Sequence, residues 1–228
     1  MYKYLKIFLL MIILVFNVAC KNSEIDQINM YLAASLLNQV ESNIESYDTR
    51  LNIDSSGSYD LVNKVLLGAK PDLLLIANYK LKNEFFEDYE FIENYYSSKV
   101  ILVHNQNHEI GLKIICENKY EIGIADPSRA PLGKLSSEIL KDNKCGQGEY
   151  NTKITSNASS LINKINLKYL NYAFIYENDI NEINKNLNFK ASEYNFQKDI
   201  NYSFFLNKDL SLDKKKNALD FIKYLKNK

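Results

Sequence analysis

The feature that most constrains the fold is a regular alternation of short apolar runs and amphipathic helical patterns along most of the chain. Short apolar runs, each followed by residues with helical spacing, are typical of βα units. The predicted strands lie at residues 28–32, 51–53, 72–77, 100–103, 121–125, 172–176 and 202–206, with a short one near Ile154. Repeated βα units predict an α/β fold with mostly parallel strands, which binds ligands beyond the carboxyl ends of those strands.

Three polar loops lie between a predicted strand and a predicted helix, within residues 30–37, 54–61 and 124–133. A helix start carries about half a positive charge and up to four unpaired N–H donors, so several starts at one point form an anion site without Lys or Arg. Ser35 and Ser58 stand just before two of these helices. Serine also caps helices for structural reasons alone. The small residues around both serines nevertheless allow a ligand to approach the backbone, and Gly57 fits such a loop.

Other residues could belong to the same site. Residues 157–160 form a fourth polar helix start, and Tyr176 ends a predicted strand, so that its hydroxyl could reach the same crevice. A tyrosine at a strand end also serves simply to pack the core. Tyr95 and Tyr96 resemble the paired phenolates of ferric-ion-binding proteins, although residues 89–96 are better interpreted as one aromatic packing face.

The sequence gives little support to a nucleophilic role for Ser58. Gly57-Ser58 lacks the G-x-S-x-G pattern of a nucleophile elbow. His104 and His108 fall in one polar segment, and no Asp or Glu is placed by a motif to orient either ring. We interpret both histidines as solvated loop residues. The pattern therefore favours a binding protein over an enzyme.

The N-terminal segment has the form of a secretory signal. Lys3 and Lys6 precede an apolar run at residues 7–16, which is too short for an ordinary membrane span, and Ala19-Cys20 follows. Cys directly after Ala19 resembles a bacterial lipobox, in which that Cys is acylated, although Asn17 stands where Leu is usual. We expect residues 1–20 to be a lipoprotein signal peptide. A plain signal peptide or an uncleaved anchor remains the alternative.

The remaining chain has a nearly balanced charge and two cysteines. The whole sequence has 28 basic and 28 acidic residues, and residues 1–20 contain two lysines and no acid, so the mature chain carries a net charge of −2. No basic excess indicates a nucleic-acid partner. Cys116 and Cys145 could form a disulfide outside the cytoplasm or remain separate thiols. Neither belongs to a motif with zinc-ligand spacing.

Four motifs in order resemble the molybdate- or tungstate-binding lipoproteins of ABC importers, which are type II solute-binding proteins. They span residues 31–176. The motifs are Leu32-Ala33-Ala34-Ser35-Leu36, the Ser-rich loop from Ser55 that leads to Gly68-Ala69-Lys70-Pro71-Asp72, Asp126-Pro127 with Pro131-Leu132-Gly133, and Tyr172-Ala173-Phe174-Ile175-Tyr176.

The resemblance implies a periplasmic-binding-protein fold. In this fold two lobes, each a mostly parallel sheet flanked by helices, are joined by two crossing strands and close on a tetrahedral oxyanion. Laid on this sequence, residues 21–103 and 202–228 would form the first lobe and residues 104–201 the second, with crossings near residues 100–103 and 200–202. The implied oxyanion ligands are Ser35, Ser58, Leu132, Ala158 and Tyr176.

One branch of the family adds two carboxylates to the metal's shell. The corresponding positions here are Ala130 and Ala158, so the resemblance implies hydrogen bonds alone, with no side chain as a metal ligand. We leave Arg129 as a solvated residue beside the site, with anion steering as the alternative role.

The resemblance also implies a function. The chain would be a non-catalytic monomer without a cofactor, anchored through Cys20 at the periplasmic or extracellular face of the cytoplasmic membrane. It would deliver molybdate or tungstate to an ABC permease with its ATPase. Three alternatives remain: another ligand such as sulfate, phosphate or ferric ion, an α/β enzyme that uses Ser58, or a surface receptor without transport.

Overall fold

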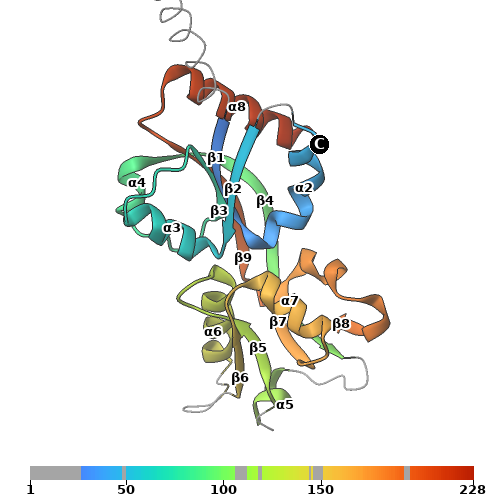
Figure 1. Cartoon of the computed structure of the whole chain (residues 1–228). Coiled ribbons are helices and arrows are strands. Elements are labelled where there is room, and N and C mark those ends of the chain that lie inside the picture. Colours follow the sequence, from blue (N-terminus) through green and yellow to red (C-terminus); the bar gives the residue numbers. More distant parts are fainter. Residues whose placement is uncertain are drawn as a thin grey trace, which may run out of the picture.

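The computed structural model describes residues 27–47, 50–105, 112–117, 120–143, 145, 151–192 and 196–228. The predicted signal segment, Cys20 and His108 lie outside these residues. Two α/β lobes lie end to end and are joined by two long strands (Figure 1). The expected α/β, two-lobed fold is confirmed. No helix in the described ranges combines the length and apolar character that a membrane span requires.

The first lobe is built on three parallel strands. They are β1 (Gln27–Ala33), β2 (Arg50–Ser56) and β3 (Leu73–Ala77), with β1 in the middle. All five residues of β3 are buried, as its continuous apolar run predicts. The lobe's helices are the 3₁₀ helix η1 (Ala34–Leu36) and the α-helices α2 (Leu37–Glu45), α3 (Ser58–Leu66), α4 (Phe85–Asp88) and α8 (Leu212–Lys226).

Two antiparallel strands, β4 (Tyr89–Asn105) and β9 (Asp199–Asn207), run between the lobes. They pair from Tyr89 with Asn207 to Lys99 with Asp199, and β9 also pairs with β3. From Val100 onward β4 pairs with β7 of the second lobe. The predicted strand at residues 100–103 is therefore the end of a 17-residue strand. The residue boundaries of the two lobes stay a prediction.

The second lobe repeats the design of the first. Its parallel strands are β5 (Ile122–Ala125), β6 (Thr152–Thr155) and β7 (Tyr172–Tyr176), and the full order is β2-β1-β3-β9-β4-β7-β5-β6. Its other elements are α5 (Leu112–Glu117), α6 (Pro131–Asp142), α7 (Ala158–Asn166), η2 (Glu177–Glu182), η3 (Lys185–Leu187) and β8 (Phe189–Ala191), which pairs with β4.

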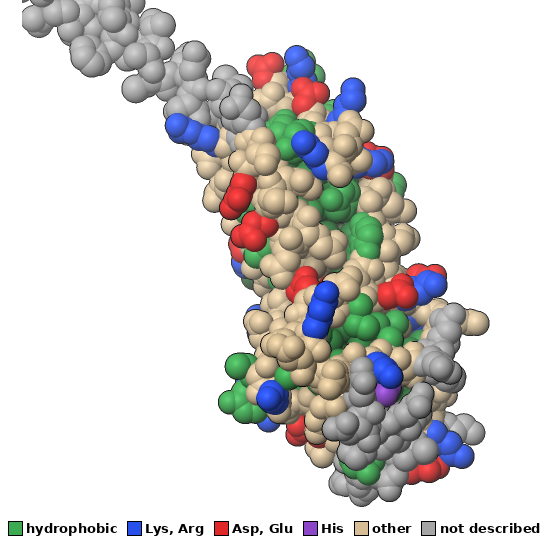
Figure 2. Space-filling view, turned by 90° about the vertical axis from the view of Figure 1, so that its right-hand side faces the viewer, with side chains coloured by type: hydrophobic (Ala, Val, Ile, Leu, Met, Phe, Trp, Pro, Cys, Tyr) green, Lys and Arg blue, Asp and Glu red, His purple; other side chains and the backbone are tan. Residues whose placement is uncertain are grey.

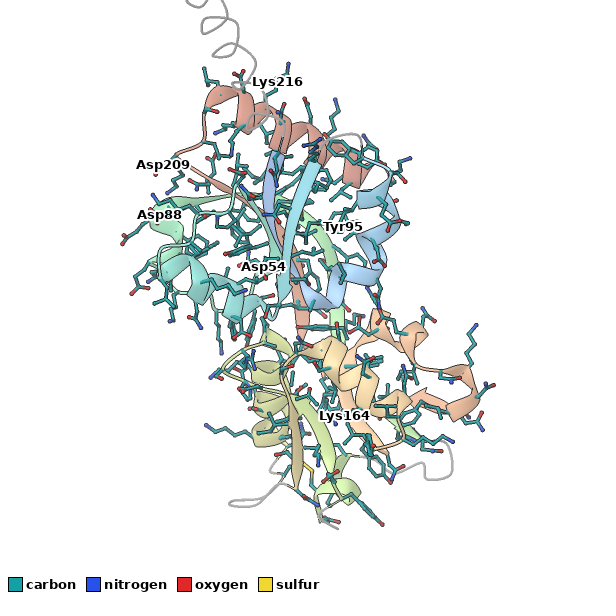
Figure 3. The ribbon with its side chains drawn as sticks, in the orientation of Figure 1. Asp54, Asp88, Tyr95, Lys164, Asp209 and Lys216 are labelled. Atoms are coloured by element: carbon teal, nitrogen blue, oxygen red, sulfur yellow. A yellow bond between two sulfur atoms is a disulfide. The ribbon has the colours of Figure 1, made fainter. Side chains whose placement is uncertain are left out.

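Cys116 and Cys145 form a disulfide in the second lobe, at the end away from the first lobe (Figure 3). Of the two alternatives left open by the sequence, the bridge is the one observed. A bridge of this kind persists in oxidising compartments outside the cytoplasm.

The surface carries both signs of charge. On the face shown in Figure 2, Lys and Arg side chains alternate with Asp and Glu over both lobes. This mixture accords with the balanced composition of the sequence. A surface of this kind lacks the one-sided basic field that steers nucleic acid to a protein.

Candidate functional site

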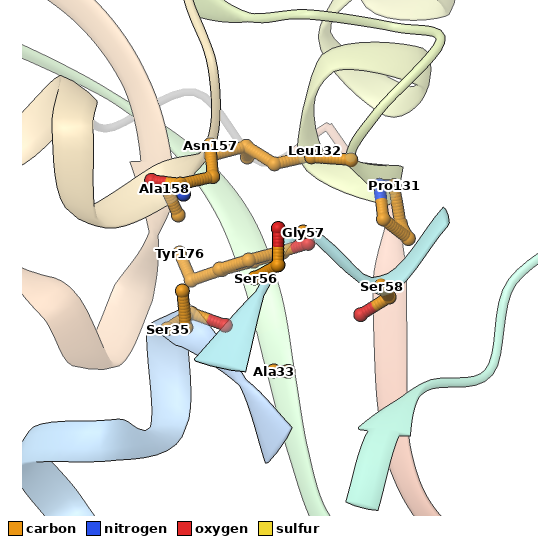
Figure 4. Close-up of a pocket in the computed structure, with 12 residues that line it drawn as sticks. Ala33, Ser35, Ser56, Gly57, Ser58, Pro131, Leu132, Asn157, Ala158 and Tyr176 are labelled. Atoms are coloured by element: carbon orange, nitrogen blue, oxygen red, sulfur yellow. The ribbon is translucent and has the colours of Figure 1, made fainter. Parts of the chain in front are cut away.

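Four helix starts meet at one small pocket between the lobes (Figure 4). They are the starts of η1 and α3 in the first lobe and of α6 and α7 in the second. The residues that line the pocket are small or neutral: Ala33, Ala34, Ser35, Ser56, Gly57, Ser58, Ala130, Pro131, Leu132, Asn157, Ala158 and Tyr176. The five oxyanion ligands expected from the sequence are all among them. The polar loops singled out in the sequence thus converge in space.

Local sequence determines which backbone amides of these helix starts can serve the pocket. α6 begins with Pro131, which has no N–H, so Leu132 supplies the first backbone donor of that helix. Asn157 caps α7 by accepting a hydrogen bond from the Ser160 N–H at 2.9 Å. The amides at the very start of each helix have no partner within the helix. The pocket is therefore lined by donors and the positive ends of helix dipoles.

Ser58 uses an oxygen lone pair, not its hydroxyl proton, in its hydrogen bond to the backbone. The side chain is 3 % exposed, and its Oγ accepts a hydrogen bond from the Ala77 N–H at 3.0 Å. A hydroxyl has one proton and two lone pairs, so Ser58 keeps its O–H to donate elsewhere. The geometry suits a hydrogen-bond donor to an anion.

His104 corrects one interpretation made from the sequence. It is not a solvated loop residue: it belongs to β4, is buried, and its Nδ1 lies 3.2 Å from the Asn105 carbonyl oxygen. The apolar run before it continues as a strand through His104, because this segment pairs with β7 and β8. His104 does not line the pocket, so it is not placed to act as a base for Ser58.

Ser35, Tyr176 and the neighbouring Tyr202 contact one another at the pocket. Ser35 Oγ lies 2.7 Å from the hydroxyl of Tyr202, and the rings of Tyr202 and Tyr176 meet edge to face with centroids 5.7 Å apart. The Tyr176 side chain also lines the pocket, whereas Tyr202 lies behind it. Burial raises the pKa of Tyr176 and of Tyr202 well above the usual range. Both phenols are therefore neutral donors.

Tyr202 was missed by the sequence analysis, which treated it only as part of a strand. Its partner Ser35 is 167 residues away in the chain. The available signal was a hydroxyl at the start of the apolar run Tyr202–Leu206. Tyr95 and Tyr96 instead pack against Phe204 and Tyr202, with ring centroids 5.3 and 6.4 Å apart. Neither lines the pocket, which supports the packing interpretation over paired phenolates.

A buried acid lies close to Tyr176 and Tyr202. Asp179 is three residues past Tyr176, is 3 % exposed, and its Oδ2 has no hydrogen-bond partner among the described residues. Burial raises the pKa of Asp179 to about 8, and the charge of Glu182 adds to this shift. A carboxyl with this pKa is largely protonated at neutral pH. It thus adds little negative charge beside a pocket built from donors.

The lobes touch through several direct contacts around the pocket. The Tyr59 N–H donates to the Arg129 carbonyl oxygen at 3.2 Å, and the Ser159 hydroxyl donates to the Ala34 carbonyl oxygen at 2.9 Å. The Arg129 guanidinium pairs with Asp60 of the first lobe at 2.9 Å. Arg129 is therefore neither free in solvent nor part of the pocket lining.

A second group of contacts lies farther from the pocket. Glu138 of the second lobe accepts hydrogen bonds from the Tyr79 hydroxyl at 2.7 Å and from Lys80 at 2.6 Å. Asn38 of the first lobe donates to Glu182 at 2.9 Å. The cavity itself has a volume of about 10 Å³, which is close to the requirement of one water molecule. The lobes are closed, and a tetrahedral oxyanion requires more room than this cavity offers.

Comparison with known proteins gives a consistent picture. A family model described as bacterial extracellular solute-binding protein matches residues 33–228. No curated protein matches the chain. Among solved structures, the apo regulatory domain of HypT from Salmonella typhimurium has a TM-score of 0.69 at 12% identity, with 91% of this chain and 99% of that chain covered.

Two other similar structures are described as molybdenum or molybdate proteins. The Azotobacter vinelandii periplasmic molybdate-binding protein has a TM-score of 0.64 at 15% identity and covers 87% of this chain and 92% of its own. The substrate binding domain of a putative molybdenum ABC transporter from Clostridium difficile has a TM-score of 0.56 at 18% identity, with coverages of 88% and 92%. At these identities the likeness establishes the fold.

Proposed function

The chain belongs to the bacterial extracellular solute-binding proteins, and on that premise we propose that it captures molybdate or tungstate between its lobes. The observation that carries this proposal is the convergence of four helix starts and the Ser35, Ser58 and Tyr176 hydroxyls on one pocket without a charged lining residue. Such a pocket favours an anion whose oxygens only accept hydrogen bonds, that is, a fully deprotonated dianion.

Neutral donors are sufficient for tight binding. Hydrogen bonds to a charged group contribute about 1.5–3 kcal/mol each, so about seven contribute roughly 10–20 kcal/mol. Association costs about 4–15 kcal/mol. The difference is compatible with dissociation constants in the micromolar to nanomolar range. Because the closed cavity is small, the lobes must separate to admit the oxyanion, which then favours closure by contacting both lobes.

The proposed role extends to transport. The protein would be a monomer that delivers its oxyanion to an ABC permease with its ATPase, tethered through lipidated Cys20 outside the cytoplasmic membrane. Residues 21–103 and 202–228 would move as one lobe and residues 104–201 as the other. The extracellular family and the Cys116–Cys145 disulfide support a location outside the cytoplasm.

Calorimetric titration of the chain without residues 1–20 tests the ligand. Molybdate, tungstate, sulfate and phosphate are titrated in parallel. Tight binding of the first two with weak or absent binding of the others supports the proposal. Preference for sulfate or phosphate would reassign the ligand, and absence of binding to all four would remove the oxyanion function.

Two substitutions connect binding to the pocket. Ser58→Ala and Tyr176→Phe each remove one donor, so each should weaken molybdate binding by about 10- to 100-fold. The matched controls are Ser203→Ala, a buried serine bonded to Asn94, and Tyr172→Phe, at the opposite end of β7. Both controls should keep the affinity. If Ser58→Ala and Tyr176→Phe also keep it, the ligand binds elsewhere.

A further inference from the structure

Tyr202 connects a donor of each lobe. It lies on the crossing strand β9 and is 2 % exposed; its hydroxyl bonds to Ser35 of the first lobe, and its ring meets the ring of Tyr176 of the second lobe edge to face. Its place is fixed by backbone pairing with Ala77 on one side and Tyr96 on the other. Ala77 is also the residue whose N–H binds Ser58. Tyr202 is thus anchored at the centre of the site without lining the pocket.

The number of hydroxyl protons on Ser35, Tyr176 and Tyr202 limits which hydrogen bonds these residues can donate. Each of the three hydroxyls has one proton and can accept further hydrogen bonds. Tyr202 forms a hydrogen bond with Ser35, so Ser35 can direct its own proton at an oxyanion only if Tyr202 is the donor in that bond.

We propose that Tyr202 is a positioning residue of the oxyanion site, which orients the Ser35 hydroxyl toward the bound dianion by donating a hydrogen bond to its oxygen. The inference rests on the proposed function, because it concerns the same pocket. A chain of hydroxyls also polarises each member, so that donation by Tyr202 strengthens the donor that it contacts. Loss of the Tyr202 hydroxyl therefore weakens binding through Ser35, although Tyr202 itself does not touch the ligand.

A double-mutant cycle on molybdate affinity tests this inference. Tyr202→Phe keeps the ring contact with Tyr176 and removes the hydroxyl. Tyr202→Phe and Ser35→Ala should each weaken binding by about tenfold. The double variant should bind nearly as well as the weaker single variant, because both changes disable the same donor. Tyr96→Phe is the control: its ring packs against Tyr202, yet it should leave the affinity unchanged and add no coupling to Ser35→Ala.

The outcomes separate the two proposals. If the unsubstituted protein binds molybdate or tungstate and the two effects multiply, or if Tyr202→Phe has no effect, the positioning role is wrong while the proposed function stands. If the unsubstituted protein binds none of the four oxyanions, both are wrong. Thermal unfolding confirms that each variant is folded. Should Tyr202→Phe fail to fold, Ser35→Ala is titrated alone, and an unchanged molybdate affinity overturns the inference because Tyr202 then has no donor to orient.

Discussion

Asp179 is a titratable group close to Tyr176 of the pocket and to Tyr202 behind it. Burial raises the pKa of this carboxyl from 3.8 to about 8, and the nearby charge of Glu182 contributes to the shift. Between these values the folded protein holds a proton that the unfolded chain releases. Stability must therefore fall as the pH rises from about 4 to about 8, and level off above that range.

Asp179→Asn removes this pH dependence. The neutral amide does not titrate, so the variant should gain stability relative to the original protein between pH 5 and pH 8, by a few kcal/mol at most. Urea unfolding at several pH values measures the difference. Asp199→Asn, at an exposed position of β9, controls for the loss of a carboxylate in general. Parallel pH curves for Asp179→Asn and the original protein would contradict the prediction.

At the scale of single residues, the sequence predicted those pocket residues that lie in recognisable local motifs. Ser35, Ser58, Leu132, Ala158 and Tyr176 each stand at a helix start or a strand end, where the chain itself marks an exposed amide or hydroxyl. Tyr202 and Asp179 were missed because their importance arises from contacts. Tyr202 matters through Ser35, far away in the chain, and Asp179 through its burial, which a polar segment such as residues 177–182 does not predict.

Among the elements, the start of α3 is adapted to lobe contact. Gly57, its N-cap, has φ −60 and ψ 141, which alanine also adopts readily. An added Cβ would nevertheless lie 2.4 Å from the Arg129 carbonyl oxygen of the other lobe. Gly57→Ala should therefore obstruct closure and leave each lobe folded. We expect molybdate affinity to fall by about tenfold or more, with little change in the unfolding temperature.

Gly133→Ala is the matched control at the start of α6. Its Cβ would lie 2.1 Å from the Ala125 carbonyl oxygen, within the second lobe. This clash opposes folding itself and should cost about 1–3 kcal/mol of stability. Calorimetry and thermal unfolding of both variants separate the two effects. An equal loss of stability in both variants, or an unchanged affinity in Gly57→Ala, would show that α3 does not limit closure.

The sequence predicted helices and strands well where one pattern of apolar residues continues through the whole element, as in β3 and α7. β4 was predicted only over residues 100–103, although it begins at Tyr89. Its register with β9 shifts between Phe91 and Glu93 and again between Asn94 and Tyr96. Each such irregularity interrupts the alternation of inward and outward side chains. The strand pattern was therefore hidden in the part of β4 that pairs with β9.

At the scale of the whole molecule, the sequence pattern did not predict how the two lobes are placed relative to each other. Two lobes and their crossing strands follow from a resemblance in motif order, but the closed arrangement depends on pairs such as Arg129 with Asp60 and Lys80 with Glu138. The two partners of each pair are separated by 69 and 58 residues. All four are charged side chains of kinds that are common on the surface. Nothing in their local sequence distinguishes them from other solvated side chains.

These two ion pairs should bias the lobes toward closure without determining it. Both are partly exposed, and exposed pairs contribute about 0–1 kcal/mol each. Removing both partners on the second lobe, with Arg129→Gln and Glu138→Gln, should thus weaken molybdate binding by a few-fold to about tenfold. Small-angle X-ray scattering of the ligand-free double variant should show a larger radius of gyration than that of the original protein.

The control for this prediction is an ion pair within one lobe. Glu90 of β4 and Lys215 of α8 lie 2.7 Å apart with similar exposure, so Glu90→Gln removes a comparable pair that does not join the lobes. It should change neither the affinity nor the radius of gyration. Added salt should weaken binding by the original protein more than by the double variant, because salt screens the pairs that the variant lacks. Equal salt dependence in both would mean that closure is held by the backbone contacts of Tyr59 and Ala34 instead.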